Sequence, residues 1–186
     1  MPFLTVFTRT HPRPVEFLHR NVYSLRQQTD RDYEQIVLRD EVGRGLGWAN
    51  AQFYANRHRA TGEYVLMMDD DNVFVTNLAI AALKLVTWDR PDAVIFKASV
   101  GPHGVLPAAA AWKARTPIAY QIDGHCCIVR RDVWMEHVQA FATERMGDWA
   151  FYQALFAAGG RVEWVNMVLI EALRVGSMNW QAAEVA

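Results

Sequence analysis

The chain has 186 residues, 52% of them hydrophobic and 21% charged, with a formal net charge of −1 at pH 7. This composition excludes a disordered chain and suffices for one domain with a sizeable core. The near-neutral charge excludes a general attraction to nucleic acid or to an anionic membrane. No apolar run approaches the ~18 residues of a membrane-spanning helix, and the sequence does not start with a signal-peptide pattern. With only two cysteines, which are adjacent, we expect a cytoplasmic protein, with peripheral membrane attachment as the alternative.

The first half of the sequence alternates short apolar runs with segments of helical periodicity. The predicted strands cover residues 4–7, 36–38, 64–68 and 93–96, and the predicted helices cover 14–28, 49–59 and 76–87. This alternation favours an α/β fold with a mostly parallel central sheet flanked by helices.

Polar side chains follow three of these strands, at the point where each strand ends. They are Thr8, Arg9, Asp40, Asp69, Asp70 and Asp71. Parallel strands of an open α/β sheet end at one edge, where ligands of such sheets bind. We therefore expect these side chains to gather at one crevice.

Three adjacent acids, Asp69, Asp70 and Asp71, end the most apolar of these strands. Neighbouring carboxylates repel one another, so one of them gains a proton unless a cation lies nearby. Hard oxygen ligands of this kind suit a divalent metal ion that is shared with phosphate. A solvated acidic turn is the alternative.

The second half is less regular. Residues 99–117 are rich in Gly, Pro and Ala, which predicts a loop on the substrate side. Strands are predicted over 122–129 and 162–165, and a helix follows Asp132. A further helix is predicted to open near Asp148 and to end at Gly159, and we expect residues 174–186 to be a loosely ordered tail.

Four stretches in this order carry a recognisable set of motifs: S-L-x-x-Q-T from Ser24, G-E-Y-V before D-x-D from Gly62, R-R-x-x-W from Arg130, and G-D-W with a later A-G from Gly147. Together they resemble family-two glycosyltransferases, which are inverting enzymes of the GT-A fold. The resemblance spans nearly the whole chain.

The resemblance implies a metal-dependent, hexosyltransferase-like enzyme. It would move a sugar from a nucleotide-diphosphate sugar, UDP-linked by default and GDP-linked as the alternative, to a hydroxyl of a glycan, a lipid-linked or a protein acceptor. Mn²⁺ or Mg²⁺ would be the cofactor. A single GT-A-like domain would cover residues 1–186, with a nucleotide-binding half (1–98) and an acceptor and catalytic half (99–186) that ends in the flexible tail.

The same resemblance assigns roles to individual residues. Nucleotide contacts fall on Thr8, Arg9, Asp40, Asp69 and Asp70. The metal falls on Asp71, with Asp69, and the general base is Asp148. Weaker candidates for the acceptor or diphosphate side are His125, Trp112, Arg174 and Ser177.

The chain also departs from the family pattern. Arg39 occupies a position that is often acidic in the family, and Gly147 replaces a glutamate. The C-terminal histidine that some members offer to the metal has no counterpart in residues 174–179. We see no nucleophile beside an activating group, which favours single displacement.

Other interpretations stay open at this point. Asp69-x-Asp71 also matches the nucleophile motif of haloacid-dehalogenase-like phosphatases, although their motif normally lies on the first strand. A sugar nucleotidyltransferase or an inactive relative that keeps only the nucleotide site are further alternatives. Asp148 has a structural interpretation as a helix N-cap, and Asp40 as a turn residue.

Overall fold

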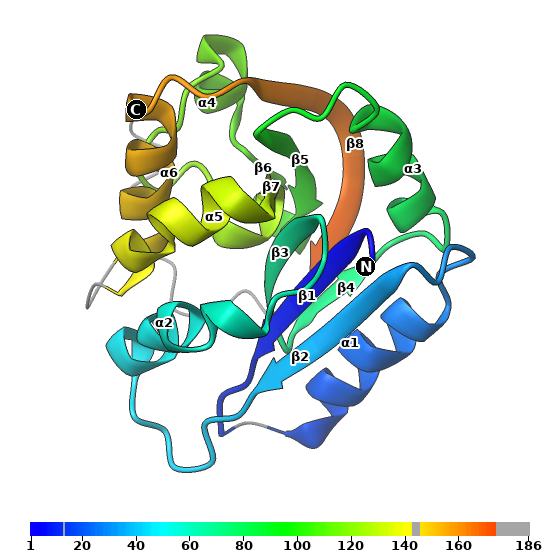
Figure 1. Cartoon of the computed structure of the whole chain (residues 1–186). Helices are drawn as coiled ribbons and strands as arrows, with labels where there is room; N and C mark the ends of the chain where they lie inside the picture. Colours follow the sequence, from blue (N-terminus) through cyan, green and yellow to red (C-terminus); the bar gives the residue numbers. More distant parts are fainter. Residues whose placement is uncertain (13, 143–145, 174–186) are drawn as a thin grey trace.

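One sheet runs through the described part of the chain, which comprises residues 1–12, 14–142 and 146–173 of a computed structural model (Figure 1). Its strands are β1 (Leu4–Arg9), β2 (Tyr33–Leu38), β3 (Tyr64–Asp69), β4 (Asn72–Phe74), β5 (Ala93–Ser99), β6 (Val105–Leu106), β7 (Cys127–Arg130) and β8 (Val162–Ala172). The strand order is β2-β1-β3-β7-β5-β8-β4, and β6 pairs with β5.

Most strands of the sheet run in one direction. β1 is parallel to β2 and β3, and β5 is parallel to β8. β7 lies between β3 and β5 and is antiparallel to both, so β3 and β5 share a direction. β4 and β6 are antiparallel to their neighbours β8 and β5. The predicted α/β fold with a mostly parallel sheet is confirmed, but the antiparallel insertion of β7 was not foreseen.

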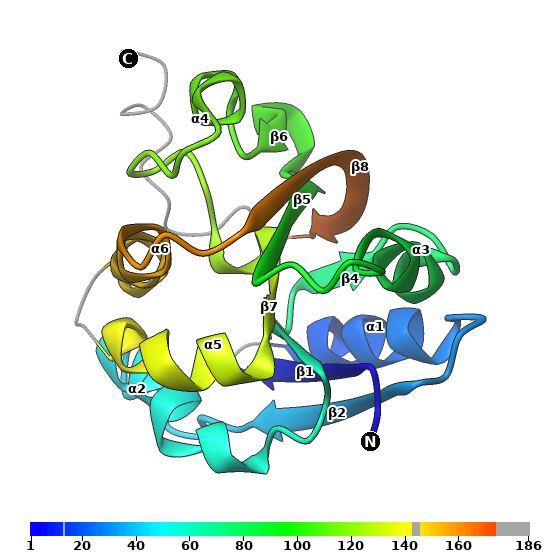
Figure 2. The same ribbon diagram turned by 45° about the horizontal axis from the view of Figure 1, so that its top comes forward.

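The helices lie on both sides of this sheet. They are α1 (Val15–Arg26), α2 (Leu46–Ala55), α3 (Ala79–Val86), α4 (Ala109–Ala114), α5 (Arg131–His137) and α6 (Gly147–Ala157). α2, α5 and α6 group on one side, whereas α1 and α3 lie on the other (Figure 2). Within the described residues, no helix combines the length and the apolar character needed to cross a bilayer.

A chain of aromatic rings fixes the helices of the first group against the sheet. Phe7 of β1 stacks on Trp134 of α5 at 5.3 Å between ring centroids, and it also contacts Phe53 of α2 at 6.3 Å. Phe53 contacts Phe141, which in turn contacts Phe151 of α6 at 5.1 Å. Truncating a buried aromatic ring to alanine typically costs about 3–5 kcal/mol. These contacts therefore hold α6 at a defined place relative to β1.

The edge strand β4 is covered by polar side chains of α1. Asn21 donates a hydrogen bond to the Asn72 carbonyl at 2.7 Å, and the Phe74 N–H donates to the Ser24 hydroxyl at 3.2 Å. An unpaired strand edge is a template for pairing with another chain. The side chains of α1 satisfy this edge instead.

Several predicted boundaries differ from the structure. The predicted strand over 122–129 is reduced to β7, because residues 124–126 form a 3₁₀ turn, and the strand predicted over 162–165 continues to Ala172. The predicted loop over 99–117 contains β6 and α4. The division into halves at residue 98 stays a prediction, and β5 itself crosses that point.

Candidate active site

The acids after β3 form a tight turn, Asp69–Asn72, which we call the acidic turn. The Asp69 N–H donates to the Asn72 side-chain oxygen at 2.9 Å, and the Asp70 N–H donates to the Arg9 carbonyl at 3.0 Å. Asp70 and Asp71 are only 2% and 6% exposed. The burial of these acids excludes the interpretation as a solvated turn.

Arg9, at the end of β1, binds the first acid of this turn. Its Nε and Nη2 atoms donate to the two carboxylate oxygens of Asp69, the second at 3.2 Å, and Nη1 donates to Asn50 of α2. Burial alone would lower the pKa of Arg9, but the charge of Asp69, with those of Asp123 and Asp148, raises it. Burial alone would raise the pKa of Asp69, but Arg9 lowers it. Both groups therefore stay charged.

The antiparallel direction of β7 brings a second segment to the same edge of the sheet. Leu66 of β3 pairs with Ile128 of β7, so residues before Ile128 lie toward the end of β3. The segment carries Asp123 and the buried His125, whose Nδ1 lies 3.1 Å from the Asp123 carboxylate. Besides Asp123, the charges of Asp69 and Asp71 raise the pKa of His125, so the imidazole lies within electrostatic range of the acidic turn.

The pKa values of this pair move apart. Burial opposes the charge on both groups, but the His125 imidazole and Arg9 lower the pKa of Asp123 to about 2. The Asp123 carboxylate raises the pKa of His125 despite burial. His125 Nε2 is buried and has no hydrogen-bond partner among the described residues.

Asp148 reaches the cluster from the first turn of α6. A methyl group added to Gly124 would lie 3.9 Å from the Asp148 Cβ atom, so Asp148 lies near the segment that carries Asp123. Burial raises the pKa of Asp148 to about 7, and the Asp123 charge adds to this effect. Met146, not Asp148, occupies the N-cap position, and its side chain makes no cap bond. The Asp148 carboxylate nevertheless accepts backbone N–H groups, those of Trp149 and of Asp148 itself, so it also stabilises the first turn of α6.

Gly147 explains one departure from the family pattern. A Cβ atom at this position would lie 2.5 Å from the Phe141 carbonyl oxygen and 2.8 Å from the Asn50 amide nitrogen. Contacts this short do not occur, so no larger side chain fits without a backbone shift. The absence of a glutamate at this position follows from the close packing of α6 against α2.

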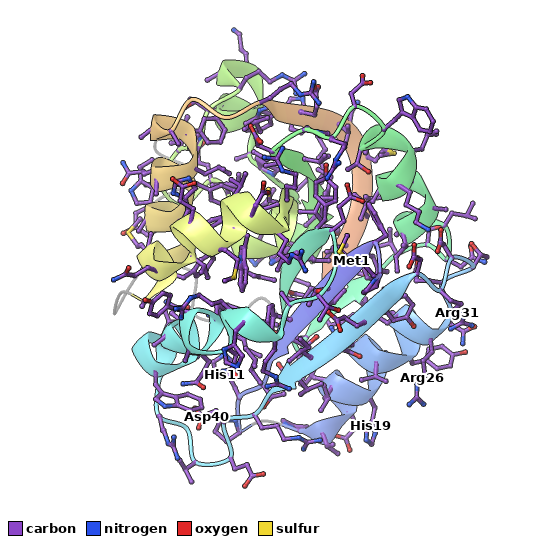
Figure 3. All side chains as sticks on the ribbon, in the orientation of Figure 1. Met1, His11, His19, Arg26, Arg31 and Asp40 are labelled. Carbon is purple, nitrogen blue, oxygen red and sulfur yellow. The ribbon has the colours of Figure 1, made fainter. Side chains whose placement is uncertain are left out.

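Two predicted nucleotide residues have internal partners. The Thr8 hydroxyl accepts a hydrogen bond from Gln35 at 2.9 Å, inside the protein. The Asp40 carboxylate accepts three backbone N–H groups, from Val42, Gly43 and Arg44 at 3.3, 3.0 and 2.8 Å. Asp40 therefore shapes the loop that leads to α2. Figure 3 shows Asp40 and His11 at the end of the sheet opposite Met1 and Arg31.

Trp112 lies on α4 and contacts other elements. Lys97 of β5 and Arg115 lie 4.6 and 4.7 Å from its ring centroid, and Trp164 of β8 packs edge-on at 5.5 Å. The predicted acceptor contact of Trp112 stays a prediction. Arg174 and Ser177 lie outside the described residues.

Sequence reasoning missed Asp123, Asn50 and Asn21. Asn21 is fully buried and donates to the carbonyls of Asp69 and Asn72 at 3.3 and 2.7 Å, which braces the acidic turn. The signal that could have found Asn21 and Asn50 is an amide within an apolar helical pattern. For Asp123 the signal is its spacing of two residues from His125.

The donor atoms fit a divalent metal that is bound together with phosphate. Within the part of the chain that the structure describes, no three His, Cys, Asp or Glu side chains form a group that could hold a metal alone. Asp71 offers carboxylate oxygens, whereas both carboxylate oxygens of Asp69 already accept hydrogen bonds from Arg9. Mg²⁺ commonly binds one or two protein carboxylates and takes its other ligands from phosphate and water.

Comparison of the sequence with protein-family models and with curated proteins finds no match. The fold, in contrast, matches solved structures. S. aureus TarS 1-349 in complex with UDP gives a TM-score of 0.69 at 14% identity, covering 91% of this chain and 60% of that one. The mannosyltransferase PcManGT from Pyrobaculum calidifontis, in complex with GDP-Man and Mn²⁺, gives a TM-score of 0.64 at 16% identity, covering 95% of this chain and 59% of that one.

A longer S. aureus TarS structure gives a TM-score of 0.71 at 14% identity, covering 94% of this chain and 37% of that one. The chain thus spans at most about 60% of the length of these proteins. Structural similarity at such low sequence identity shows the fold alone. The chain has the GT-A-like fold of glycosyltransferases, as its motifs predicted.

Proposed function

We propose that the chain is a metal-dependent glycosyltransferase that moves a sugar from a nucleotide-diphosphate sugar to a hydroxyl acceptor with inversion. The observation that carries this proposal is that Arg9, which binds Asp69 in the first half of the chain, lies within electrostatic range of Asp148 from the second half. Structural neighbours hold UDP, UDP-GlcNAc or GDP-Man with Mn²⁺, which supports a nucleotide sugar as the donor.

The donor side would be organised by charge. Asp69, Asp70 and Asp71 share the acidic turn, and the charges of Asp123 and Asp148 also act on Arg9 beside it. Arg9 and His125 offset only part of this charge, so a diphosphate would be repelled without a divalent cation. Asp71, with Asp69, would hold Mn²⁺ or Mg²⁺. When bound, the metal would supply Lewis-acid stabilisation of the leaving diphosphate.

The acceptor side would be organised for proton transfer. A carboxylate with a pKa near the working pH is well suited to accept a proton from an attacking hydroxyl. Asp148, with a pKa of about 7, has this property. Arg9 lies close enough to both Asp69 and Asp148 for its pKa to respond to each, so it would connect the donor and acceptor sides.

For the other residues predicted to contact the nucleotide, Thr8, Asp40 and Asp70, the proposed role is to hold the shape of the site. Thr8 and Asp40 would hold the walls of the crevice through their internal hydrogen bonds. Asp70 would do the same from the acidic turn, where its carboxylate accepts the His11 N–H at 3.3 Å. Base recognition would then fall on the loop that Asp40 shapes.

A phosphatase mechanism has less support. It would use Asp69 as the nucleophile, but both of its carboxylate oxygens accept hydrogen bonds from Arg9. Such bonds stabilise the charge on the carboxylate and reduce its reactivity toward phosphorus.

The first test is ligand binding. Thermal shifts are measured with UDP and GDP, each with and without Mn²⁺, for the native chain and for Asp71→Asn. A ligand at 100 times its Kd adds about 2.7 kcal/mol to the free energy of unfolding. We expect stabilisation that requires Mn²⁺ and is lost in Asp71→Asn. Equal stabilisation with and without metal would refute the metal role, and phosphomonoester hydrolysis without nucleotide preference would favour the phosphatase.

A further inference from the structure

The outer face of α3 is apolar although it is exposed to solvent. Leu78, just before α3, is 55% exposed, Leu85 within it is 77% exposed, and Trp88 in the turn after it is 86% exposed. Figures 1 and 2 show α3 at the periphery of the described fold. A helix that is apolar on all sides is normally buried, and a contiguous exposed apolar patch marks an interaction site. We infer that this face binds the same face of a second copy of the chain in a two-fold symmetric dimer.

The inner face of α3 already has its partners in the core. Ile80 and Leu83 are fully buried there. The α3 sequence contains one charged residue, Lys84, whose ammonium lies 2.9 and 2.8 Å from the carboxylates of Asp30 and Asp32. The helix therefore adds no unpaired charge to its outer face, and like-charge repulsion between two copies of α3 is avoided.

The pattern of the outer face is symmetric along the helix. With 3.6 residues per turn, Leu78, Ala81, Ala82 and Leu85 point to the same side, and the midpoint between 78 and 85 is also the midpoint between 81 and 82. Two such helices in antiparallel contact set Leu78 of each copy against Leu85 of the other, with the alanines at the centre. The small alanines allow the close approach that packed helices need. A two-fold contact requires a surface that is complementary to itself, and this face meets that condition.

Trp88 extends the same symmetry beyond the end of the helix. Its counterpart across the midpoint is Val75, which is 45% exposed and lines a groove of about 630 Å³ between α1 and β4. Other apolar residues of this groove are Tyr23, Val73 and Leu173. Pockets of about 300–1,000 Å³ hold drug-sized ligands, so the groove has room for an indole ring. In the antiparallel arrangement, Trp88 of each copy enters the groove of the other.

The groove and α3 are held to the same segment of the chain. The Gln28 side chain, which follows α1, accepts a hydrogen bond from the Ile80 N–H at 3.2 Å and donates one to the Thr76 carbonyl at 2.8 Å. The Thr29 N–H donates to the Asn77 carbonyl at 2.8 Å. The spacing between the groove and the outer face of α3 is therefore fixed before association, which reduces the entropy cost of binding.

The size of the contact sets the expected affinity. A buried tryptophan side chain contributes about 150–250 Å², and an interface of standard size buries about 800 Å² on each partner. One helix face with one tryptophan supplies less than this standard area. We therefore expect a dimer that is in equilibrium with the monomer at micromolar concentrations.

The test is sedimentation velocity over a concentration series of the native chain, Trp88→Ala and Val42→Ala. Val42 is the matched control, because it is 70% exposed and follows Asp40, which lies at the opposite end of the sheet from Arg31 (Figure 3). We expect the native dimer to dissociate on dilution, Trp88→Ala to raise the Kd by at least about 30-fold, and Val42→Ala to leave it unchanged. A native chain that stays monomeric at its highest soluble concentration would overturn the inference, as would a dimer that Trp88→Ala leaves intact.

A charge exchange tests the antiparallel arrangement. Leu85→Lys and Leu78→Glu each set a charge against a leucine of the partner, so each variant alone should sediment as a monomer. In an equimolar mixture the two introduced charges face each other, while the second pair stays Leu78 against Leu85, so we expect a heterodimer. Circular dichroism establishes that both variants are folded. If the mixture of folded variants stays monomeric, the antiparallel pairing is wrong.

This inference goes beyond the proposed function and does not depend on it. The sedimentation experiments need neither a nucleotide sugar nor a metal. A monomeric chain that transfers sugar would overturn the dimer alone, and a dimeric chain without transfer would overturn the proposed function alone.

Discussion

The acidic turn after β3 and the first turn of α6 each carry an aspartate, and the pKa values of these two carboxyl groups are shifted in opposite directions. Asp69 is paired with Arg9 through both carboxylate oxygens, and its pKa is lowered. Asp148 is half-buried, and burial together with the charge of Asp123 raises its pKa to about 7. Pairs of acids whose environments push their pKa values apart are typical of sites in which one acid carries charge and the other moves a proton. We therefore expect Asp69 to carry charge in donor binding and Asp148 to take up the proton of the acceptor.

The largest expected effect is on catalysis by the acceptor side. Asp148→Asn removes the proposed proton acceptor, and general-base assistance contributes roughly 10²–10⁴-fold to a rate. We expect transfer to fall by that factor, while the affinity for the nucleotide diphosphate with Mn²⁺ stays within about twofold. Product formation by mass spectrometry and binding by calorimetry check the two parts. Full residual activity would remove Asp148 from the mechanism.

The next largest effect is a lower free energy of unfolding, which we expect when the ion pair of Arg9 and Asp69 is broken. Arg9→Met leaves Asp69 as a partly buried charge without its partner. Breaking a fully buried ion pair costs about 3–5 kcal/mol, and we expect a smaller loss here, of about 2 kcal/mol. The free energy of unfolding from urea denaturation measures this loss. The double variant Arg9→Met with Asp69→Leu is the control, because it removes both charges and should lose less than Arg9→Met alone. If the double variant is the less stable one, the pair is not what stabilises this edge.

Gly147→Ala tests the packing that places Asp148. The added methyl group would overlap the Phe141 carbonyl, and overpacking of this kind costs about 1–3 kcal/mol. We expect a lower Tm and a displaced Asp148, with transfer reduced more than nucleotide binding. Thermal melts and the two assays above measure these effects. A variant with native Tm and activity would show that α6 is not fixed by this contact.

The smallest expected effect is the pH dependence of stability. The carboxyl pKa of Asp148 rises from 3.8 to about 7 on folding, so the folded state binds the extra proton between these values. The resulting stability is fully present below pH 4 and is lost as the pH rises through 7. Because Asp148 is partly exposed, we expect only about 2 kcal/mol.

Urea denaturation at pH 5 and pH 8 checks this sign. Asp69 and Asp123 have lowered pKa values and act in the opposite direction, so the comparison is made between the native chain and Asp148→Asn. The variant should gain stability relative to the native chain at pH 8 but not at pH 5. The reverse order would contradict a raised pKa.

The sequence predicted that Arg9 and the acidic turn would lie together, because the argument needed only parallel strands. Arg9 ends β1 and the acidic turn ends β3, and these two strands are parallel neighbours. Their role in binding a donor stays a prediction. The same argument could not predict the place of Asp123, because Asp123 precedes its strand. β7 is antiparallel to β3, and therefore its beginning, not its end, lies at the edge of the sheet where β3 ends.

The partners of individual side chains were less accessible from the sequence. Thr8 and Asp40 stand at the predicted places, but their hydrogen bonds to Gln35 and to the loop after Asp40 depend on packing between elements. Gly147 looked like a departure from a motif. Its reason is a contact with Phe141 and Asn50, which no local pattern encodes.

The way in which α1 covers β4 also bears on self-association. Asn21, Ser24 and Gln28 occupy three backbone groups, those of Asn72, Phe74 and Thr76, along the outer side of the sheet. A second molecule that tried to add a strand there would have to displace all three side chains first. We therefore expect the native chain to resist fibril growth from this side, with Asn21, Ser24 and Gln28 acting as a barrier against aggregation.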